Sequence, residues 1–275
     1  MPKSPHTVKF HDGRAAAQLG LGVWQVPDDE AAAVVATALQ TGYRLIDTAA
    51  IYGNESGVGK GIANAGMERN QLFITTKLWN DRHGYDSAMA AFDESLERLG
   101  LDYIDLYLIH WPVPKVDSYV AAWKALIQLR DEGRAKSIGV SNFTIEHLQR
   151  LLDQTGVIPV VNQIELHPSF QQRELRDFHT AQGIATQAWS PLAQGTLWDD
   201  AALRSIARKH GRSVAQIIIR WHIDIGNLVI PKSVTPARIR ENFDVWDFSL
   251  DRDDLAAIAA LDRPDGRIGP DPLDV

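Results

Sequence analysis

The sequence contains no cysteine among its 275 residues. Disulfides, thiolate metal sites and cysteine nucleophiles are therefore excluded, which fits a reducing compartment. No apolar run approaches the roughly 18 residues that cross a bilayer. The first residues, MPKSPHTVKF, also lack the apolar stretch of a secretion signal. These absences lead us to expect a cytoplasmic protein without a membrane segment.

An excess of positive charge is missing as well. Lys plus Arg number 28 against 35 for Asp plus Glu, giving a net charge of −7. This balance argues against a nucleic-acid-binding surface, although it leaves room for a local basic pocket. There is no H-E-x-x-H motif and no convincing metal cluster among the nine histidines. We therefore expect neither a nucleic-acid partner nor a metal.

Short apolar runs alternate with helical patterns along the whole chain. The runs predict eight strands, at Leu19–Gln25, Tyr43–Asp47, Leu72–Lys77, Ile104–His110, Lys136–Ser141, Val160–Glu165, Ile184–Trp189 and Leu228–Pro231. The helical patterns cover Asp28–Gln40, Ser56–Ala65, Ser87–Leu99, Ser118–Asp131, Thr144–Gln154, Gln171–Gln182, Ser213–Ile223 and Pro236–Phe243. Ser213 and Gln216 form a capping-box pattern at one helix start.

Eight strand–helix units in this length predict an α/β fold, a (β/α)8 TIM barrel. Val8–Phe10 followed by His11-Asp12-Gly13 predicts an N-terminal β-hairpin. Two extra helices are expected at Ala201–Lys209 and Asp253–Leu261, and residues 262–275 are rich in Pro and Gly, which is typical of a loop. Because no linker or repeat interrupts the pattern, we predict a single domain over 1–275, in a monomer.

Polar side chains follow three successive strands. Asp47, Lys77 and His110 stand at predicted strand ends, and Tyr52 comes five residues after Asp47. Each of them alone would suit a cap, a salt bridge or packing. Because the active sites of barrels lie at the carboxyl ends of the strands, the four together predict a catalytic site.

These four residue types suit proton delivery to a carbonyl oxygen during hydride transfer. A free tyrosine has a pKa near 10. An ammonium group about 4 Å away could lower this pKa by roughly three units, toward neutrality. We expect Lys77 to have this effect on Tyr52, Asp47 to orient Lys77, and a neutral His110 to donate a hydrogen bond to the carbonyl.

The hydride must come from a cofactor, because no side chain supplies one. Gly57-Val58-Gly59-Lys60-Gly61 lacks the Ser or Thr of a P-loop and lies in a helical pattern, so it is a poor phosphate site. A better candidate is the segment 230–242, in which Lys232 follows a strand and Thr235-Pro236 predicts a helix start. With Arg238 in the same segment, two cations favour the extra phosphate of NADPH or NADP.

Other strand ends carry groups suited to the rest of such a cofactor. Ser141, Asn142 and Gln163 could hold a carboxamide, and Trp189 could stack on a nicotinamide ring. Further tryptophans at strand ends suggest an aromatic wall around a small organic substrate, made of Trp24, Trp79 and Trp111 beside His110.

The motifs GYRLIDTAAIYGNE, ITTKLW, DLYLIHWP, IGVSNF, VNQIELHP and IPKSV resemble those of the aldo-keto reductases, in order, from about Val8 to Leu261. TTKLWNDRHG, VNQIELHPSFQQRE and AWSPLAQG are most similar to the bacterial group around 2,5-diketo-D-gluconate reductase. The resemblance implies an NADPH-dependent reductase of aldehydes and ketones, such as small dicarbonyls, keto-sugars or aromatic aldehydes.

The resemblance also assigns roles. Tyr52 would donate the proton, supported by Asp47 and Lys77, and His110 would orient the carbonyl. The implied cofactor-binding residues are Gly22, Val23, Ser141, Asn142, Gln163, Trp189, Ser190, Leu192, Gln194, Ile230, Lys232, Ser233, Val234, Arg238, Glu241 and Asn242. Within that set, Ser190, Leu192 and Gln194 would lie along the pyrophosphate, and Glu241 and Asn242 near the adenine ribose.

Two departures from the family pattern stand out. Trp189 occupies a position where many members have Tyr, and a short Pro/Gly-rich tail replaces the long C-terminal loops of the wider family. Two other functions stay open from the residues. One is a Schiff-base lyase or isomerase using Lys77. The other is a non-catalytic, NADPH-binding sensor or partner protein.

Overall fold

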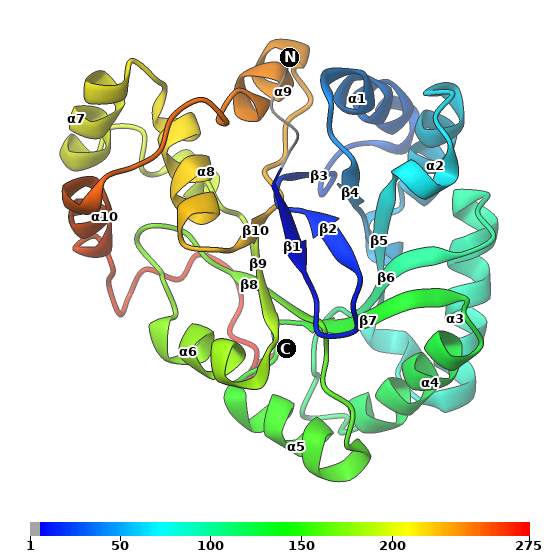
Figure 1. The fold of residues 1–275 in the computed structure, drawn as a ribbon. Helices are drawn as coiled ribbons and strands as arrows, with labels where there is room; N and C mark the ends of the chain where they lie inside the picture. Colours follow the sequence, from blue (N-terminus) through cyan, green and yellow to red (C-terminus); the bar gives the residue numbers. More distant parts are fainter. Residues whose placement is uncertain (1–5) are drawn as a thin grey trace.

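The computed structural model describes residues 6–275, and a ring of eight parallel strands forms its centre (Figure 1). Neighbouring strands follow chain order from β3 to β10. Two parallel bridges, Leu19 to Val229 and Gly22 to Lys232, join the last strand to the first. The strands are β3 (Gly20–Gly22), β4 (Leu45–Asp47), β5 (Phe73–Leu78), β6 (Ile104–Ile109), β7 (Ala135–Ser141), β8 (Val161–Glu165), β9 (Ala185–Trp189) and β10 (Leu228–Val229).

Helices surround this ring and confirm the predicted (β/α)8 barrel (Figure 1). They are α1 (Asp28–Thr41), α2 (Glu55–Asn64), α3 (Tyr85–Leu99), α4 (Tyr119–Asp131), α5 (Ile145–Thr155), α6 (Arg173–Gln182), α7 (Ala201–His210), α8 (Val214–Asp224), α9 (Pro236–Phe243) and α10 (Arg252–Ala259). Four single 3₁₀ turns lie in the loops of the described chain, at η1 (Ala50–Tyr52), η2 (Arg69–Gln71), η3 (Asn80–Arg82) and η4 (Ala193–Gly195).

The predicted strand over 19–25 is too long, because the chain leaves the sheet after Gly22 and turns at Gln25, whose φ is 60°. The last strand is also shorter than predicted, with two residues. The capping box is confirmed, since Ser213 N donates to Gln216 Oε1 at 3.0 Å and Gln216 N to Ser213 Oγ at 3.2 Å. Thr235 does precede α9, but its side chain makes no capping hydrogen bond.

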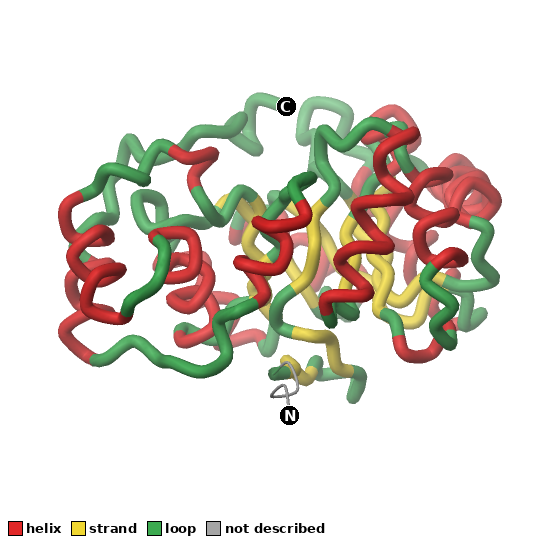
Figure 2. Tube along the Cα trace, turned by 90° about the horizontal axis from the view of Figure 1, so that it is seen from above, coloured by secondary structure: helices red, strands yellow, loops and turns green. Residues whose placement is uncertain are grey.

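The predicted hairpin forms from β1 (Thr7–Lys9) and β2 (Ala15–Ala17). It lies across the amino ends of the strands, whereas the C-terminal segment lies at the opposite end (Figure 2). Phe10 beside the hairpin is 3% exposed and its ring lies 6.1 Å from that of Phe73. Because the hairpin covers the amino end of the barrel, the carboxyl ends of the strands are left for a site.

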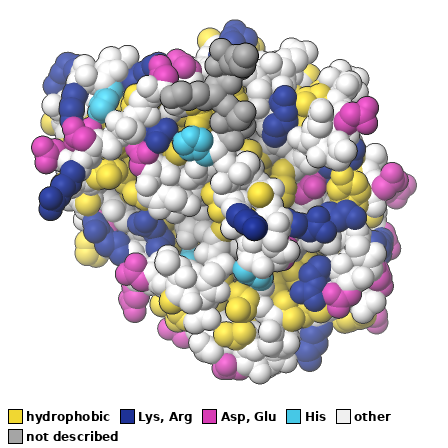
Figure 3. Space-filling model, in the orientation of Figure 1, with side chains coloured by type: hydrophobic (Ala, Val, Ile, Leu, Met, Phe, Trp, Pro, Cys, Tyr) yellow, Lys and Arg dark blue, Asp and Glu magenta, His cyan; other side chains and the backbone are white. Residues whose placement is uncertain are grey.

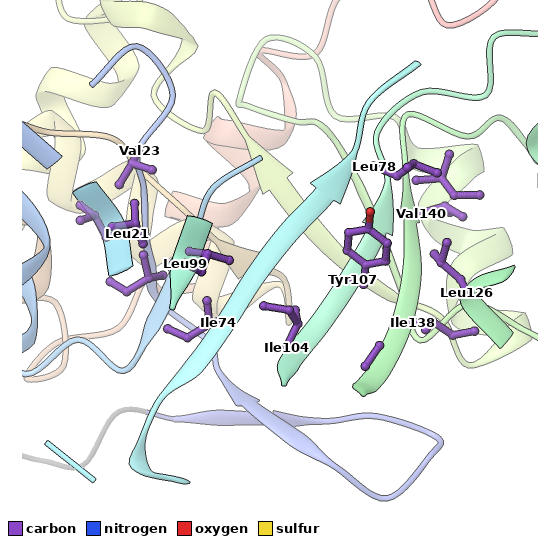
Figure 4. Close-up of a cluster of buried hydrophobic side chains, with 14 of the residues drawn as sticks. Leu21, Val23, Ile74, Leu78, Leu99, Ile104, Tyr107, Leu126, Ile138 and Val140 are labelled. Carbon is purple, nitrogen blue, oxygen red and sulfur yellow. The ribbon is translucent and has the colours of Figure 1, made fainter. Parts of the chain in front are cut away.

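The main core lies between the strands and the surrounding helices (Figure 4). Leu21, Ile74 and Tyr107 come from strands, and Leu99 and Leu126 come from helices. Around the rim of the hairpin face, basic and acidic side chains are interspersed (Figure 3). Within residues 6–275, no helix combines the length and the apolar character that crossing a membrane requires.

Candidate active site

The predicted acid, lysine and tyrosine converge at the mouth of the barrel. Asp47 ends β4, Lys77 lies near the end of β5, and Tyr52 ends the 3₁₀ turn η1 between β4 and α2. Lys77 Nζ lies 2.5 Å from Asp47 Oδ1 and 3.4 Å from Tyr52 Oη, and it donates to the backbone oxygen of Thr48 at 2.8 Å. The ammonium group is therefore fixed on three sides, with the phenol on one of them.

Burial governs the protonation of this cluster. Burial lowers the pKa of Lys77, but the attraction of Asp47 and Tyr52 outweighs it, so the pKa lies above its ordinary value. Burial raises the pKa of Tyr52, and the opposing pull of Lys77 does not cancel it. Lys77 does lower the pKa of Tyr52, as expected, but the expected net shift toward neutrality is wrong, because burial of the phenolate raises the pKa by more than the cation lowers it.

His110 directly follows β6. Its ring makes an edge-to-face contact with the ring of Tyr52, with ring centroids 5.7 Å apart. Burial, reinforced by Lys77, lowers the pKa of His110 well below its ordinary value, so the imidazole is neutral at physiological pH. Two tryptophans flank it, Trp79 at 5.1 Å and Trp111 at 6.4 Å between ring centroids. Trp24 is 45% exposed and, within residues 6–275, makes no ring contact with these aromatics.

A chain of polar side chains continues from Asp47 around the mouth. Gln163 Nε2 donates to Asp47 Oδ2 at 2.7 Å and to Gln187 Oε1 at 2.9 Å. Asn142 Nδ2 donates to the backbone oxygen of His110 at 3.0 Å, and Trp189 Nε1 donates to Asn142 Oδ1 at 2.7 Å. Ser141 Oγ links these two sets, because it accepts from Asn142 Nδ2 at 3.1 Å and donates to the backbone oxygen of Gln163 at 2.8 Å.

Beyond β10, a second hollow gathers much of the predicted phosphate-binding segment. It is a cavity of about 400 Å³, lined by Leu192, Trp198, Ser213, Val214, Ala215, Lys232, Ser233, Val234, Thr235, Arg238, Glu241 and Asn242. Within the described residues 6–275, neither Lys232 nor Arg238 forms an ion pair, and both are exposed. A pocket with two uncompensated cations at the start of α9 suits a phosphate group.

The other predicted cofactor residues do not line this cavity. Val23 and Ile230 have buried side chains, and Gly22 packs against Ile230, where a Cβ would lie 2.8 Å from the backbone oxygen. Ser190 and Gln194 lie in the loop after β9 with positive φ values of 47° and 50°. Backbone strain at residues other than glycine occurs often in ligand-binding loops.

Known proteins resemble this chain over almost its whole length. The sequence model of the Aldo/keto reductase family matches residues 16–263. The chain belongs to this family. Methylglyoxal reductase DkgA of Escherichia coli strain K12 is 57% identical over 271 residues, covering 98% of both chains. An aldo-keto reductase of Mycolicibacterium smegmatis is 56% identical over 265 residues, covering 96% of each.

Two solved structures of one further protein, Gox0644, also resemble this chain in sequence and in fold. Gox0644 in its apo form shares 54% identity and superposes with a TM-score of 0.95, covering 98% of both chains. A mutant of Gox0644, 53% identical with the same TM-score and coverage, was solved in complex with NADPH. The likeness therefore spans both the mouth of the barrel and the cavity beyond β10.

Several residues that contribute to the site of this aldo-keto reductase were not predicted from the sequence. Thr48 supplies a backbone oxygen to Lys77, and Gln187 supplies an acceptor to Gln163. Trp198 lines the second cavity from a loop that is distant in sequence from α9. The position of Thr48 directly after Asp47 could have indicated its role. In the part of the chain that the structure describes, no group of three or more His, Asp or Glu is placed to hold a metal.

Proposed function

We propose that this protein is an NADPH-dependent oxidoreductase that reduces aldehydes and ketones to alcohols, with Tyr52 as the proton donor. The observation that carries the proposal is the phenol of Tyr52 lying 3.4 Å from the buried Lys77 ammonium, beside a neutral His110. The relatives add support, because one is named a methylglyoxal reductase and another was solved with NADPH.

The residues present fit the cofactor. Lys232 and Arg238 would hold the 2′-phosphate in the cavity at the start of α9, and Glu241 and Asn242 would lie near the adenine ribose. Ser141, Asn142 and Gln163 would hold the carboxamide, and Trp189 would stack on the ring, with Ser190, Leu192 and Gln194 along the pyrophosphate. Bound there, NADPH supplies the hydride.

Side chains of the site would then supply the proton that the carbonyl oxygen takes up. The raised pKa of Tyr52 keeps the phenol protonated at neutral pH, so it is ready to act as an acid. His110 donates a hydrogen bond to the carbonyl oxygen and fixes its direction, while Tyr52 transfers its proton to that oxygen. Lys77, held charged by Asp47, stabilises the phenolate until solvent returns the proton.

This arrangement argues against the Schiff-base alternative. An attacking lysine must be neutral, whereas Asp47 and Tyr52 keep the pKa of Lys77 above its ordinary value. We propose small dicarbonyls, keto-sugars and aromatic aldehydes as substrates, because the aromatic rings of Trp79 and Trp111 lie next to His110 at the mouth. We further propose that the protein acts as a single-domain monomer in the cytoplasm, with no nucleic-acid partner.

The test follows the loss of NADPH absorbance with a panel of small carbonyl compounds. Wild-type protein should oxidise NADPH faster than NADH. Tyr52→Phe should abolish turnover and still bind NADPH, while Tyr85→Phe, at an exposed tyrosine outside the site, serves as the control. Normal turnover by Tyr52→Phe would overturn the proposed mechanism. NADPH binding without turnover of any carbonyl would favour the sensor alternative.

A further inference from the structure

The C-terminal segment 262–275 crosses the carboxyl face of the barrel (Figure 2). It contains neither helix nor strand, and yet several contacts attach it to other elements. At its start, Arg263 N donates to the backbone oxygen of Ser169 at 3.1 Å, and Asp262 Oδ1 accepts from Gln171 N at 2.8 Å. Lys115 Nζ donates to the backbone oxygen of Asp274 at 2.7 Å, and the Arg267 guanidinium lies 4.7 Å from the centre of the Phe170 ring. A further contact involves Glu165, at the end of β8.

Glu165 binds the backbone of the segment with both carboxylate oxygens. Ile268 N donates to Oε1 at 2.6 Å and Gly269 N donates to Oε2 at 2.8 Å. The carboxylate is 1% exposed, and His167 Nε2 lies 3.0 Å from the same Oε1. Hydrogen bonds from backbone amides to a buried carboxylate are among the stronger ones in proteins, so Glu165 fixes residues 268 and 269 to the rim of the barrel.

Gly269 in turn lies directly against Trp189. A Cβ atom at position 269 would stand 2.4 Å from Cη2 of the indole and 2.8 Å from Glu165 Oε2. At the opposite end of the same indole, Nε1 donates to Asn142 Oδ1 at 2.7 Å. The ring is therefore held at both ends, by a side chain of the candidate site at one end and by the backbone of the C-terminal segment at the other.

We propose that Glu165 and Gly269 are positioning residues that set the plane of Trp189 for cofactor stacking, so that docking of residues 268–275 and NADPH binding stabilise each other. This inference rests on the proposed function, because it takes Trp189 as the surface against which the nicotinamide lies. Coupling of this kind is reciprocal. NADPH must therefore hold the segment down by the same factor by which the docked segment tightens NADPH binding.

Limited trypsin digestion measures the docking without any turnover. The bond between Arg267 and Ile268 is suited to this test, because its own N–H donates to Glu165 and the segment must open before a protease can cut it. Trypsin does not cut the neighbouring Arg263–Pro264 bond, so mass spectrometry can follow loss of residues 268–275. We expect NADPH to slow this cleavage in the wild-type protein.

Glu165→Gln should speed the cleavage by about tenfold or more, since it removes a charged acceptor of two hydrogen bonds. It should also weaken the protection given by NADPH. Glu174→Gln is the matched control, because the Glu174 side chain is exposed, lies near the same segment in α6 and makes no hydrogen bond to other residues within 6–275. Equal cleavage rates for wild type and Glu165→Gln would overturn the proposal.

A second variant acts on the ring itself. Gly269→Ala should weaken NADPH binding, measured by fluorescence titration, because the new methyl group displaces either the segment or the indole. In a Trp189→Phe background, which lacks the Cη2 edge, the same substitution should have a smaller effect. Additive effects of the two substitutions would show that Gly269 does not act through Trp189. Thermal melting of each variant checks that the fold persists.

The outcomes separate this inference from the function on which it rests. A wild-type protein that does not bind NADPH would overturn both. A wild-type protein that binds NADPH and reduces carbonyls, but is cleaved at the same rate with and without NADPH, would overturn the coupling alone.

Discussion

Asp47 and Lys77 form an ion pair of 2.5 Å inside the barrel mouth, with 2% and 0% of their side chains exposed. Two charges buried so completely are expensive to desolvate, and a pair of this kind adds little net stability compared with apolar residues of the same size. Its value in this protein is local, since the charged Lys77 stands beside the hydroxyl of Tyr52. Substitutions in this pair should therefore affect the free energy of unfolding and the turnover differently, and both quantities can be measured.

We expect Asp47→Asn and Lys77→Met each to lower the free energy of unfolding by about 3–5 kcal/mol, because each leaves a buried charge without its partner. The double variant should lose less than either single variant. Turnover should fall by about 10²-fold or more in all three, since Asp47→Asn removes the carboxylate that holds the ammonium group beside Tyr52, and the other two variants remove the ammonium group itself. Urea denaturation and NADPH oxidation measure the two effects. Recovery of turnover in the double variant would contradict the role given to the ammonium group.

The exposed cation Arg238 gives a prediction about cofactor choice. It lines the cavity beyond β10 without an ion pair among residues 6–275. Arg238→Ala should weaken NADPH binding by about 10- to 100-fold, the range for losing a hydrogen bond between charged groups, and should leave NADH binding nearly unchanged. Arg240→Ala, at an exposed arginine on the same helix, is the control. An equal loss for both cofactors would refute the phosphate assignment.

The strand ends could be predicted from the sequence, because short apolar runs indicate where each strand stops. Asp47, Lys77 and His110 were found in this way, and the structure does bring them together with Tyr52. The pKa of Tyr52 was beyond that reasoning. Its direction depends on how much solvent the folded chain removes from the phenol, and no residue pattern contains that quantity.

Contacts between segments that are distant in the sequence could not be predicted from the sequence either. Glu165 ends a predicted strand and reads as one polar residue among several, yet it binds amides about a hundred positions further along the chain. Residues 262–275 are rich in Pro and Gly, which predicts a loop but gives no partner for it. The predicted lengths of β3 and β10 were too long, and the single 3₁₀ turns were not predicted, because tertiary packing overrides local preference in segments that short.

Buried histidines give the chain a dependence on pH that the sequence did not predict. His179 lies between Asn162 and Thr186, with 3.0 Å and 2.9 Å to their side-chain atoms. Burial, together with Arg176, lowers the pKa of His179 from 6.5 to about 3. In the unfolded chain the imidazole regains its ordinary pKa and takes up a proton below about pH 6.5. The folded state is therefore favoured by this group above that pH and loses the advantage as the pH falls.

We expect the free energy of unfolding to decrease between about pH 6.5 and about pH 3, by about 1.4 kcal/mol per pH unit for each such proton. His179→Gln should reduce the slope by close to one proton while leaving other titrating groups in place. Urea denaturation at several pH values measures both slopes. Identical slopes for wild type and variant would mean that His179 is already protonated in the folded protein.

The glycines at 57, 59 and 61 show why a motif needs its structural context. They resemble a phosphate-binding loop in composition, but they lie within α2. Because they have no side chain, the backbone of neighbouring helices packs directly against them. A Cβ would stand 2.1 Å from the oxygen of Asp28 at position 57, and 2.2 Å from the oxygen of Leu99 at position 59. Their function is thus close packing of α2 against α1 and the end of α3.

Substitution at Gly59 distinguishes packing from phosphate binding. Gly59→Ala should gain up to about 1 kcal/mol of helix propensity. It should nevertheless lower the free energy of unfolding by about 1–3 kcal/mol, because the methyl group forces α2 away from Leu99. Asn64→Ala, at the exposed end of the same helix, should change stability little and serves as the control. NADPH affinity should be the same in both variants. A Gly59→Ala protein of unchanged stability with weakened NADPH binding would instead place a phosphate against this helix.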